Sequence, residues 1–97
     1  MKNHQIKTHS EYFQQVWDRK KLFEIRKDDR NYEVGDTLTL LDYNPETNTY
    51  NRRTISAEIS YKLNGGNFGI ENGFCALSMS KLANWNLDEE GLPHFCS

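Results

Sequence analysis

The segment from residue 23 to residue 30 holds the side chains best placed to do chemistry in this sequence. On a β-strand, whose side chains alternate with a period of two, Phe23 and Ile25 share one face, and Glu24 and Arg26 share the other. The two charged residues then lie about 7 Å apart, at roughly 3.3 Å per residue. We expect the apolar pair to anchor a core and the charged pair to face a polar pocket. The alternative is a half-exposed strand whose charges only pair with each other.

Hydrogen bonding to a nucleobase or a nucleotide is the chemistry that this candidate pocket favours. Lys21 and Arg26 can each bind a phosphate or a base carbonyl, and Arg26 offers the planar donors of its guanidinium group. Glu24 can accept a hydrogen bond from an exocyclic amine or a ring N–H, which the edges of cytosine and guanine present. These three residues form the centre of the predicted site.

Other polar and aromatic residues extend the predicted site. His4 and Lys7 are three positions apart, so on a regular strand they point to opposite faces, and both line one cleft only if the strand ends or bulges before Lys7. Tyr43 can stack on a base, a contact worth roughly 1–3 kcal/mol with single-stranded nucleic acid. Asp29 and Arg30 have an alternative structural role as an ion pair with each other. The predicted ligand-binding set is His4, Lys7, Lys21, Glu24, Arg26, Asp29, Arg30 and Tyr43.

Length and charge restrict the class of protein. The 97 residues, 36 % hydrophobic and 27 % charged, predict one folded domain with a core over residues 4–79. Residues 81–97 form a tail that packs on this body or frays. A net charge of −2 argues against bulk electrostatic binding to a nucleic acid backbone, although it leaves room for a local basic pocket. We expect a monomer.

The cysteines and the hydropathy pattern predict a cytoplasmic protein. Cys75 and Cys96 are too few for a disulfide framework, and Cys75 lies in an apolar run that suits a buried, inert thiol. No apolar run approaches the roughly 20 residues of a membrane span, and the N-terminus lacks the apolar stretch of a signal peptide. His94 and Cys96 lack zinc-finger spacing, so we expect no metal and no cofactor.

One amphipathic helix is expected near the N-terminus. Thr8 and Glu11 have the spacing of a capping box, which predicts a helix that starts there and runs to about Lys20. Its apolar stripe consists of Tyr12, Phe13, Val16 and Trp17. A place on this stripe favours core packing of Trp17 over stacking on a base.

Strands dominate the rest of the chain. We expect them at residues 4–8, 22–27, 37–43, 54–63 and 74–79, and the alternation is clearest in the fourth. The loop at residues 64–67 contains two adjacent glycines, which restrain the backbone least. Short connections favour antiparallel pairing. The pattern therefore predicts an α+β, mostly β fold: a small mixed or antiparallel β-barrel with one helix packed beside a polar cleft.

Several of these segments occur together in a known group of proteins. The pattern runs from Lys21 to Arg30 and continues at Val34-Gly35-Asp36. Further matches are His4-Gln5-Ile6-Lys7, Tyr12-Phe13, Val16, Asp42-Tyr43-Asn44-Pro45-Glu46-Thr47 and Gly73-Phe74. The combination covers roughly residues 4–79 and resembles the ASCH-like (activating signal cointegrator homology) proteins of bacteria and phages, in the PUA-like superfamily. The resemblance implies a PUA-like barrel, and it implies RNA or a modified nucleobase or nucleotide as the partner.

A related branch of that group contains small amidohydrolases that deacylate acylated cytidine. Their pattern has a Lys, a Thr three positions later, an Arg two further on and a distant Glu. Lys21 and Arg26 match it, but Glu24 stands at the Thr position and removes the hydroxyl nucleophile. Glu71 is a candidate for the distant Glu, and Asp18 and Arg19 stand where a glycine is usual.

Three functions therefore stay open at this point. A binding module for RNA, a nucleobase or a nucleotide is the function that we predict. The first alternative is an amidohydrolase in which Lys21 and Glu24 are catalytic. The second is a protein-interaction module without a nucleic-acid ligand.

Overall fold

A computed structural model of the chain describes the backbone of residues 1–96 and the side chains of residues 1–95. It contains six strands and one helix, and the fold is α+β and mostly β, as predicted. In chain order the elements are β1 (Asn3–His9), α1 (Ser10–Trp17), β2 (Phe23–Lys27), β3 (Thr37–Asn44), β4 (Thr49–Asn64), β5 (Phe74–Leu87) and β6 (Pro93–Cys96).

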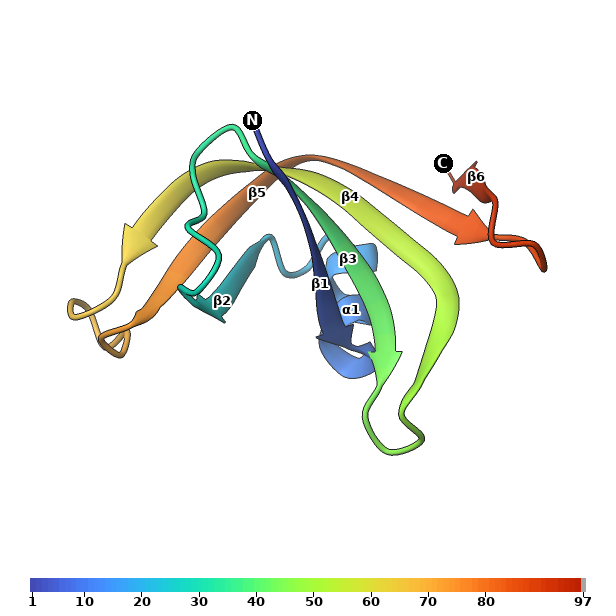
Figure 1. Cartoon of the computed structure of the whole chain (residues 1–97), viewed down its shortest axis with the longest axis horizontal. Coiled ribbons are helices and arrows are strands. Elements are labelled where there is room, and N and C mark those ends of the chain that lie inside the picture. Colours follow the sequence, from blue (N-terminus) through green and yellow to red (C-terminus); the bar gives the residue numbers. More distant parts are fainter. Residues whose placement is uncertain (97) are drawn as a thin grey trace.

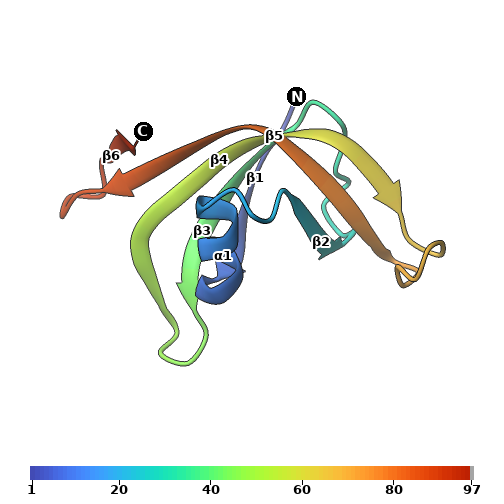
Figure 2. The same ribbon diagram turned by 180° about the vertical axis from the view of Figure 1, so that it is seen from behind.

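All strands belong to one mixed sheet that curls into a half-barrel. Its order is β1-β3-β4-β5-β2, and β6 pairs with β5 outside this path. β1 and β3 are parallel, and the other pairs are antiparallel. Figures 1 and 2 show the sheet as an arch with α1 on its concave side. The barrel-like prediction is confirmed in this form, with β1 and β2 as the two ends of the strand order.

Two arginines connect those two ends. Arg26 on β2 donates from Nη2 to the carbonyl oxygen of Lys7 on β1 at 3.0 Å. Arg30, three residues after β2, donates from Nη1 to the carbonyl oxygen of Gln5 at 2.6 Å. Because an edge strand leaves backbone groups without a ladder partner, these side chains take the place of the strand pairing that the sheet does not make here.

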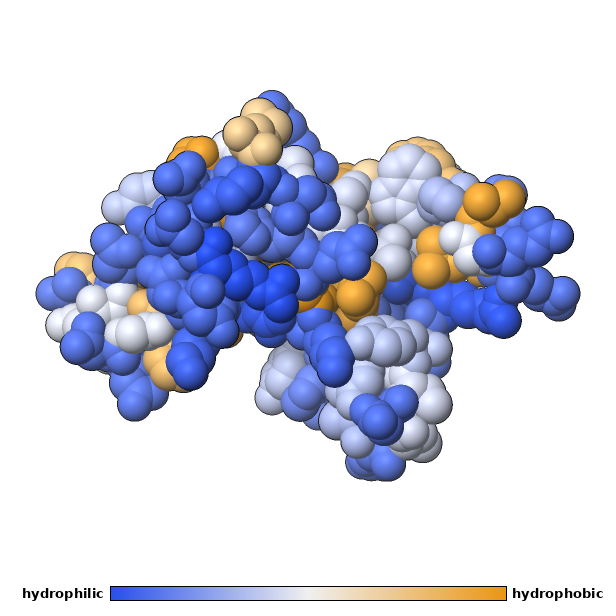
Figure 3. Space-filling model, in the orientation of Figure 1, coloured by the Kyte–Doolittle hydropathy of each residue, from blue (hydrophilic) through white to orange (hydrophobic). Residues whose placement is uncertain are grey.

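The core lies between the concave face of the sheet and α1. Ile55, Ala57 and Ile59 are buried, so the predicted alternation is confirmed in β4 up to Ile59, and it fails at the exposed Tyr61 beside a register shift. Phe13 and Val16 on α1 are fully buried against it, and Trp17 packs on the core beside Phe13, as predicted. The remaining buried apolar side chains are Ile6, Tyr32, Leu38, Leu40, Cys75, Leu77 and Met79. Hydrophilic residues cover most of the face in Figure 3.

The prediction that Phe23 and Ile25 anchor the core is wrong. They are 48 % and 54 % exposed, whereas Glu24 is 4 % exposed. Alternation on β2 is as expected, but the polar face points inward. The register explains this result: Glu24 lies opposite Leu77, which is fully buried, and cross-strand neighbours share one face of a sheet.

The bounds of the helix also differ from the prediction. α1 begins at Ser10 after an N-cap at His9 that makes no side-chain capping bond, and it ends at Trp17 instead of Lys20. Thr8 belongs to β1, because that strand pairs with β3 as far as His9. Arg19 has a φ of 62°, which no α-helix accommodates, so the chain leaves the helix before the basic run.

Two further expectations for side chains and strands fail. Tyr12 is 50 % exposed and so does not belong to the buried helix stripe. β5 continues beyond Met79 to Leu87, and β6 pairs with its second half, so much of the predicted tail extends the sheet. The period-two pattern breaks where Lys81 adopts a φ of 53°, close to a register shift between β4 and β5, and this break hid the second half of the strand.

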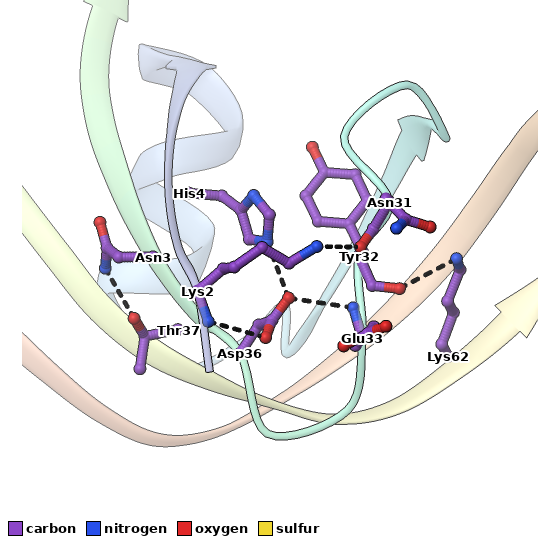
Figure 4. A network of polar contacts seen from close by, with 9 residues as sticks. All are labelled: Lys2, Asn3, His4, Asn31, Tyr32, Glu33, Asp36, Thr37 and Lys62. Carbon is purple, nitrogen blue, oxygen red and sulfur yellow. Dashed lines mark hydrogen bonds and ion pairs between the residues drawn. The ribbon is translucent and has the colours of Figure 1, made fainter.

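Asp36 is the hub of a buried polar network at the N-terminal end of β1. Its carboxylate accepts hydrogen bonds from the backbone N–H groups of Lys2 and Glu33 at 3.0 and 3.1 Å, and it lies 2.9 Å from Nε2 of His4 (Figure 4). The His4 contact, followed by the Lys2 contact, lowers the pKa of Asp36 from 3.8 to about 2. This network attaches the first residues of the chain to the loop before β3.

We predict that Asp36→Asn lowers the free energy of unfolding by about 1–3 kcal/mol, because buried donors lose a charged acceptor. The wild-type contribution is complete above the unfolded pKa of 3.8 and is lost as pH falls through the folded value of about 2. Urea unfolding from pH 5 to pH 2 checks both points. Asp29→Asn, an exposed carboxylate, is the control. Equal acid sensitivity of the Asp36→Asn variant and the wild type would contradict this assignment.

Position 65 requires glycine because the surrounding backbone leaves no room for a β-carbon. A Cβ built there would lie 2.1 Å from the carbonyl oxygen of Glu71 and 2.4 Å from that of Phe74. The close backbone approach, in addition to turn flexibility, requires this residue in the loop between β4 and β5.

Gly65→Ala should therefore destabilise the protein by about 1–3 kcal/mol through overpacking against backbone that cannot move freely. Thermal unfolding measures the effect. As a comparison, Ser60→Ala on the exposed face of β4 should stay within about 0.5 kcal/mol of wild type. A Gly65→Ala variant as stable as wild type would show that the loop relaxes.

Candidate functional site

A hollow of about 400 Å³ lies between β1, the first turn of α1 and β2. It occupies the side of the molecule where β1 and β2 face each other without pairing, and Arg26 reaches across this space to Lys7. The residues that line it are Lys7, Thr8, His9, Tyr12, Lys21, Phe23, Glu24, Ile25 and Arg26. The structure thus brings Lys21, Glu24 and Arg26 to one concavity.

Glu24 is the buried charge of this hollow. Its Oε1 lies 2.9 Å from Nζ of Lys21, and its Oε2 lies 3.9 Å from Nη1 of Arg26. Lys21 is held in place because its ammonium also donates to the carbonyl oxygen of Phe23 at 2.7 Å and lies 5.0 Å from the centre of the Phe23 ring. Both cations stay partly exposed, so the group presents one acceptor between two donors to the hollow.

Sequence reasoning missed five of the lining residues, namely Thr8, His9, Tyr12, Phe23 and Ile25. Tyr12 and Phe23 had been assigned to apolar faces, yet each leaves about half of its surface exposed. Thr8 is 3 % exposed, and its Oγ1 has no hydrogen-bond partner among the described residues. No sequence signal separates these residues from core positions, because only the curl of the sheet brings β1 opposite β2.

A second hollow of about 330 Å³ adjoins the first. Ile25 and Arg26 line both, and the other lining residues of the second are Lys27, Asp29, Arg30, Tyr32 and Phe74. Burial raises the pKa of the Tyr32 phenol. Arg26 opposes this rise, because its positive charge and its hydrogen bond to the phenol favour the ionised form. Three cations and one carboxylate therefore surround this space.

Asp29 and Arg30 do not form the ion pair that was considered for them. No ion pair between them is present in the described part of the chain, and Arg30 instead bonds to the backbone of β1. Both residues line the second hollow.

The remaining predicted residues lie elsewhere or only at the rim. His4 faces inward, where it contacts Asp36 and packs edge-on against Tyr32 with ring centres 4.7 Å apart. Lys7 faces outward at the first hollow, and its ammonium lies 4.9 Å from the ring centre of Tyr43. Opposite faces for His4 and Lys7 are what the alternation predicted. Tyr43 lines neither hollow and packs on Tyr50 at 5.1 Å.

The described residues also bear on cysteine chemistry, metal binding and membrane insertion. Cys75 is fully buried and its pKa is raised by burial, as suits an inert thiol. The side chain of Cys96 lies outside the described residues. Within residues 1–95, no three His, Cys, Asp or Glu side chains are grouped so that they could hold a metal ion. The helix α1 in the described part of the chain is neither long nor apolar enough to cross a membrane.

Comparison with known proteins places the chain in a family. The profile described as "Domain of unknown function (DUF3850)" matches residues 3–79. The chain belongs to this family. The matched segment contains every residue of both hollows, so the two sites lie within the family domain.

The chain is also similar to an uncharacterized 12.9 kDa protein encoded in the GpA 3′ region of Escherichia phage P2. The two are 52 % identical over 42 residues, which is 43 % of this chain and 38 % of the phage protein. Neither match carries a link to the ASCH or PUA-like proteins, and that resemblance stays a prediction.

The Lys21–Glu24 pair allows a direct test of the site's electrostatics. Lys21→Met should lower the free energy of unfolding by about 1–3 kcal/mol, because it leaves a buried carboxylate without its nearest cation. Lys21→Met combined with Glu24→Leu should recover most of this loss. Urea unfolding of the two single variants and the double variant completes the cycle. A double variant whose loss equals the sum of the single losses would show that the pair does not couple.

Proposed function

We propose that this domain binds a nucleobase, presented by a nucleotide or by RNA, in the first hollow. The observation that carries the proposal is the buried carboxylate of Glu24, which lies between Lys21 and Arg26 on the wall of a concavity of about 400 Å³. Ligand pockets of such a size usually combine apolar walls with a few convergent polar groups.

The position of Glu24 is difficult to explain by stability alone. Taking a carboxylate out of water is costly, and a buried ion pair often stabilises a fold no better than apolar residues of the same volume. Its neighbour across the ladder, Leu77, shows that an apolar side chain suits this face. A carboxylate at this position is therefore better explained by what it binds.

Donor and acceptor positions on the wall suit the edge of cytosine or guanine. Glu24 accepts from the exocyclic amine or the ring N–H, while Lys21 or Arg26 donates to the base carbonyl. Tyr12 and Phe23, both half-exposed at the same hollow, offer ring faces on which a base can stack. Uracil, whose ring N–H lies between two carbonyls, also matches one acceptor between two donors, so uridine belongs in the same binding series.

Amide hydrolysis has weaker support than binding. Because Glu24 stands at the position of the catalytic Thr, a hydroxyl nucleophile would have to come from another element. Thr8 is the lining residue of the first hollow that carries an aliphatic hydroxyl group. Its Oγ1 is enclosed and has no basic partner in the described part of the chain. An enclosed hydroxyl without a base is poorly placed to attack a substrate. Release of cytidine from acylated cytidine by the purified protein would reverse this judgement.

A protein-interaction role without a nucleic-acid ligand is also less well supported. Phe23, Ile25 and Tyr61 leave apolar surface exposed on β2 and β4. That alternative called for a large apolar patch and no polar cleft, whereas here the polar hollows adjoin the exposed residues.

The proposal predicts saturable binding of cytidine or guanosine at low salt, measured by calorimetry. Glu24→Gln should weaken the binding about tenfold, because an amide presents one acceptor where the carboxylate presents two and loses the charge. Glu89→Gln, at an exposed position away from both hollows, should leave it unchanged. Binding that is absent for every nucleoside, nucleotide and short RNA tried would rule the proposal out.

A further inference from the structure

The two hollows share two lining residues and differ in chemical character. Ile25 and Arg26 belong to both walls. On one side of Arg26 lie the buried Glu24 and the exposed aromatic rings. Lys27 and Arg30 line the second hollow, with Asp29 as the one carboxylate among its lining residues.

Some hydrogen-bond donors of the cations in the second hollow are not used within the protein. The side chain of Lys27 makes no hydrogen bond or ion pair within the part of the chain that the structure describes. Arg30 makes one such contact, from Nη1 to Gln5, which leaves most of its guanidinium donors available. With Arg26 these residues outnumber Asp29 by three charges to one, so the hollow favours an anion.

The charge pattern suits one phosphate and not a long polyanion. The chain carries a net charge of −2, and a protein that follows a nucleic acid backbone needs many cations along its surface. Three cations and one carboxylate leave a net charge of +2 around this hollow, which a single phosphate group can balance.

We propose that the second hollow binds the phosphate of the nucleotide whose base occupies the first hollow. The preferred ligand is then a nucleoside monophosphate, with its sugar at Arg26. This inference rests on the proposed function and adds to it the class of ligand and its direction in the site. In this arrangement Lys27 and Arg30 bind the phosphate. Glu24 and Lys21 form hydrogen bonds with the base.

The test compares each nucleoside with its own 5′-monophosphate by calorimetry, with cytidine and guanosine as the probes. We expect the monophosphate to bind about tenfold more tightly, since charge-assisted hydrogen bonds add to those of the base. Inorganic phosphate should compete with the monophosphate and leave nucleoside binding unaffected. A nucleoside that binds as tightly as its monophosphate overturns the phosphate assignment and leaves the nucleobase site standing. Absence of binding by both overturns the nucleotide assignment, and absence of binding by short RNAs as well overturns the two proposals together.

Lys27→Met supplies the decisive variant, because Lys27 has no polar contact whose loss would disturb the fold. It should reduce the preference for monophosphate over nucleoside about three- to fivefold and leave nucleoside affinity unchanged. Lys20→Met removes the same charge from an exposed position outside both hollows and is the matched control. Arg30→Lys keeps the charge and should retain part of the preference. Equal losses for Lys27→Met and Lys20→Met would show a general charge effect and contradict the phosphate site.

Discussion

The curl of the sheet, which brings β1 and β2 face to face without pairing them, is the constraint on which the rest of the structure depends. Two side-chain hydrogen bonds, from Arg26 to Lys7 and from Arg30 to Gln5, span that space. Ladder hydrogen bonds would close the barrel and fill the same space with backbone. Side chains bridge it at separate points and leave concave surface between them, and both hollows lie there.

This arrangement gives the arginines two roles at once. Arg26 holds the sheet edge, lies 3.9 Å from Glu24 and lines both hollows. A guanidinium has five donors in a fixed plane, so one donor can serve the fold while others face a ligand. Binding at either hollow would thus act on the same side chain that connects the ends of the sheet.

Buried polar groups in this domain divide by how completely they are satisfied. Asp36 and Asp42 each have several partners: Asp36 contacts two backbone N–H groups and His4, and Asp42 contacts Ser10 and the guanidinium of Arg53. Both fasten one element to another. Glu24 differs from Asp36, because its contacts are to side chains that remain partly exposed at a hollow, as is the contact of Asp42 with Arg53. That difference separates Asp36, a structural carboxylate with backbone partners, from the carboxylate that we place in a site.

Local pattern determined a good part of this protein. The alternation of β4 as far as Ile59 and the buried positions Phe13 and Val16 of α1 follow from spacing, since the 2.0 and 3.6 residue periods fix which side chains share a face. The same period places Glu24 and Arg26 on one face of β2. Which face lies inside is a different question. Only pairing with β5 turned Glu24 inward and left Phe23 exposed, because the period of a strand is the same for both faces. Likewise only the curl of the sheet brought Thr8 and Tyr12 beside β2, since contact between elements far apart in the sequence depends on tertiary packing and leaves no local signal.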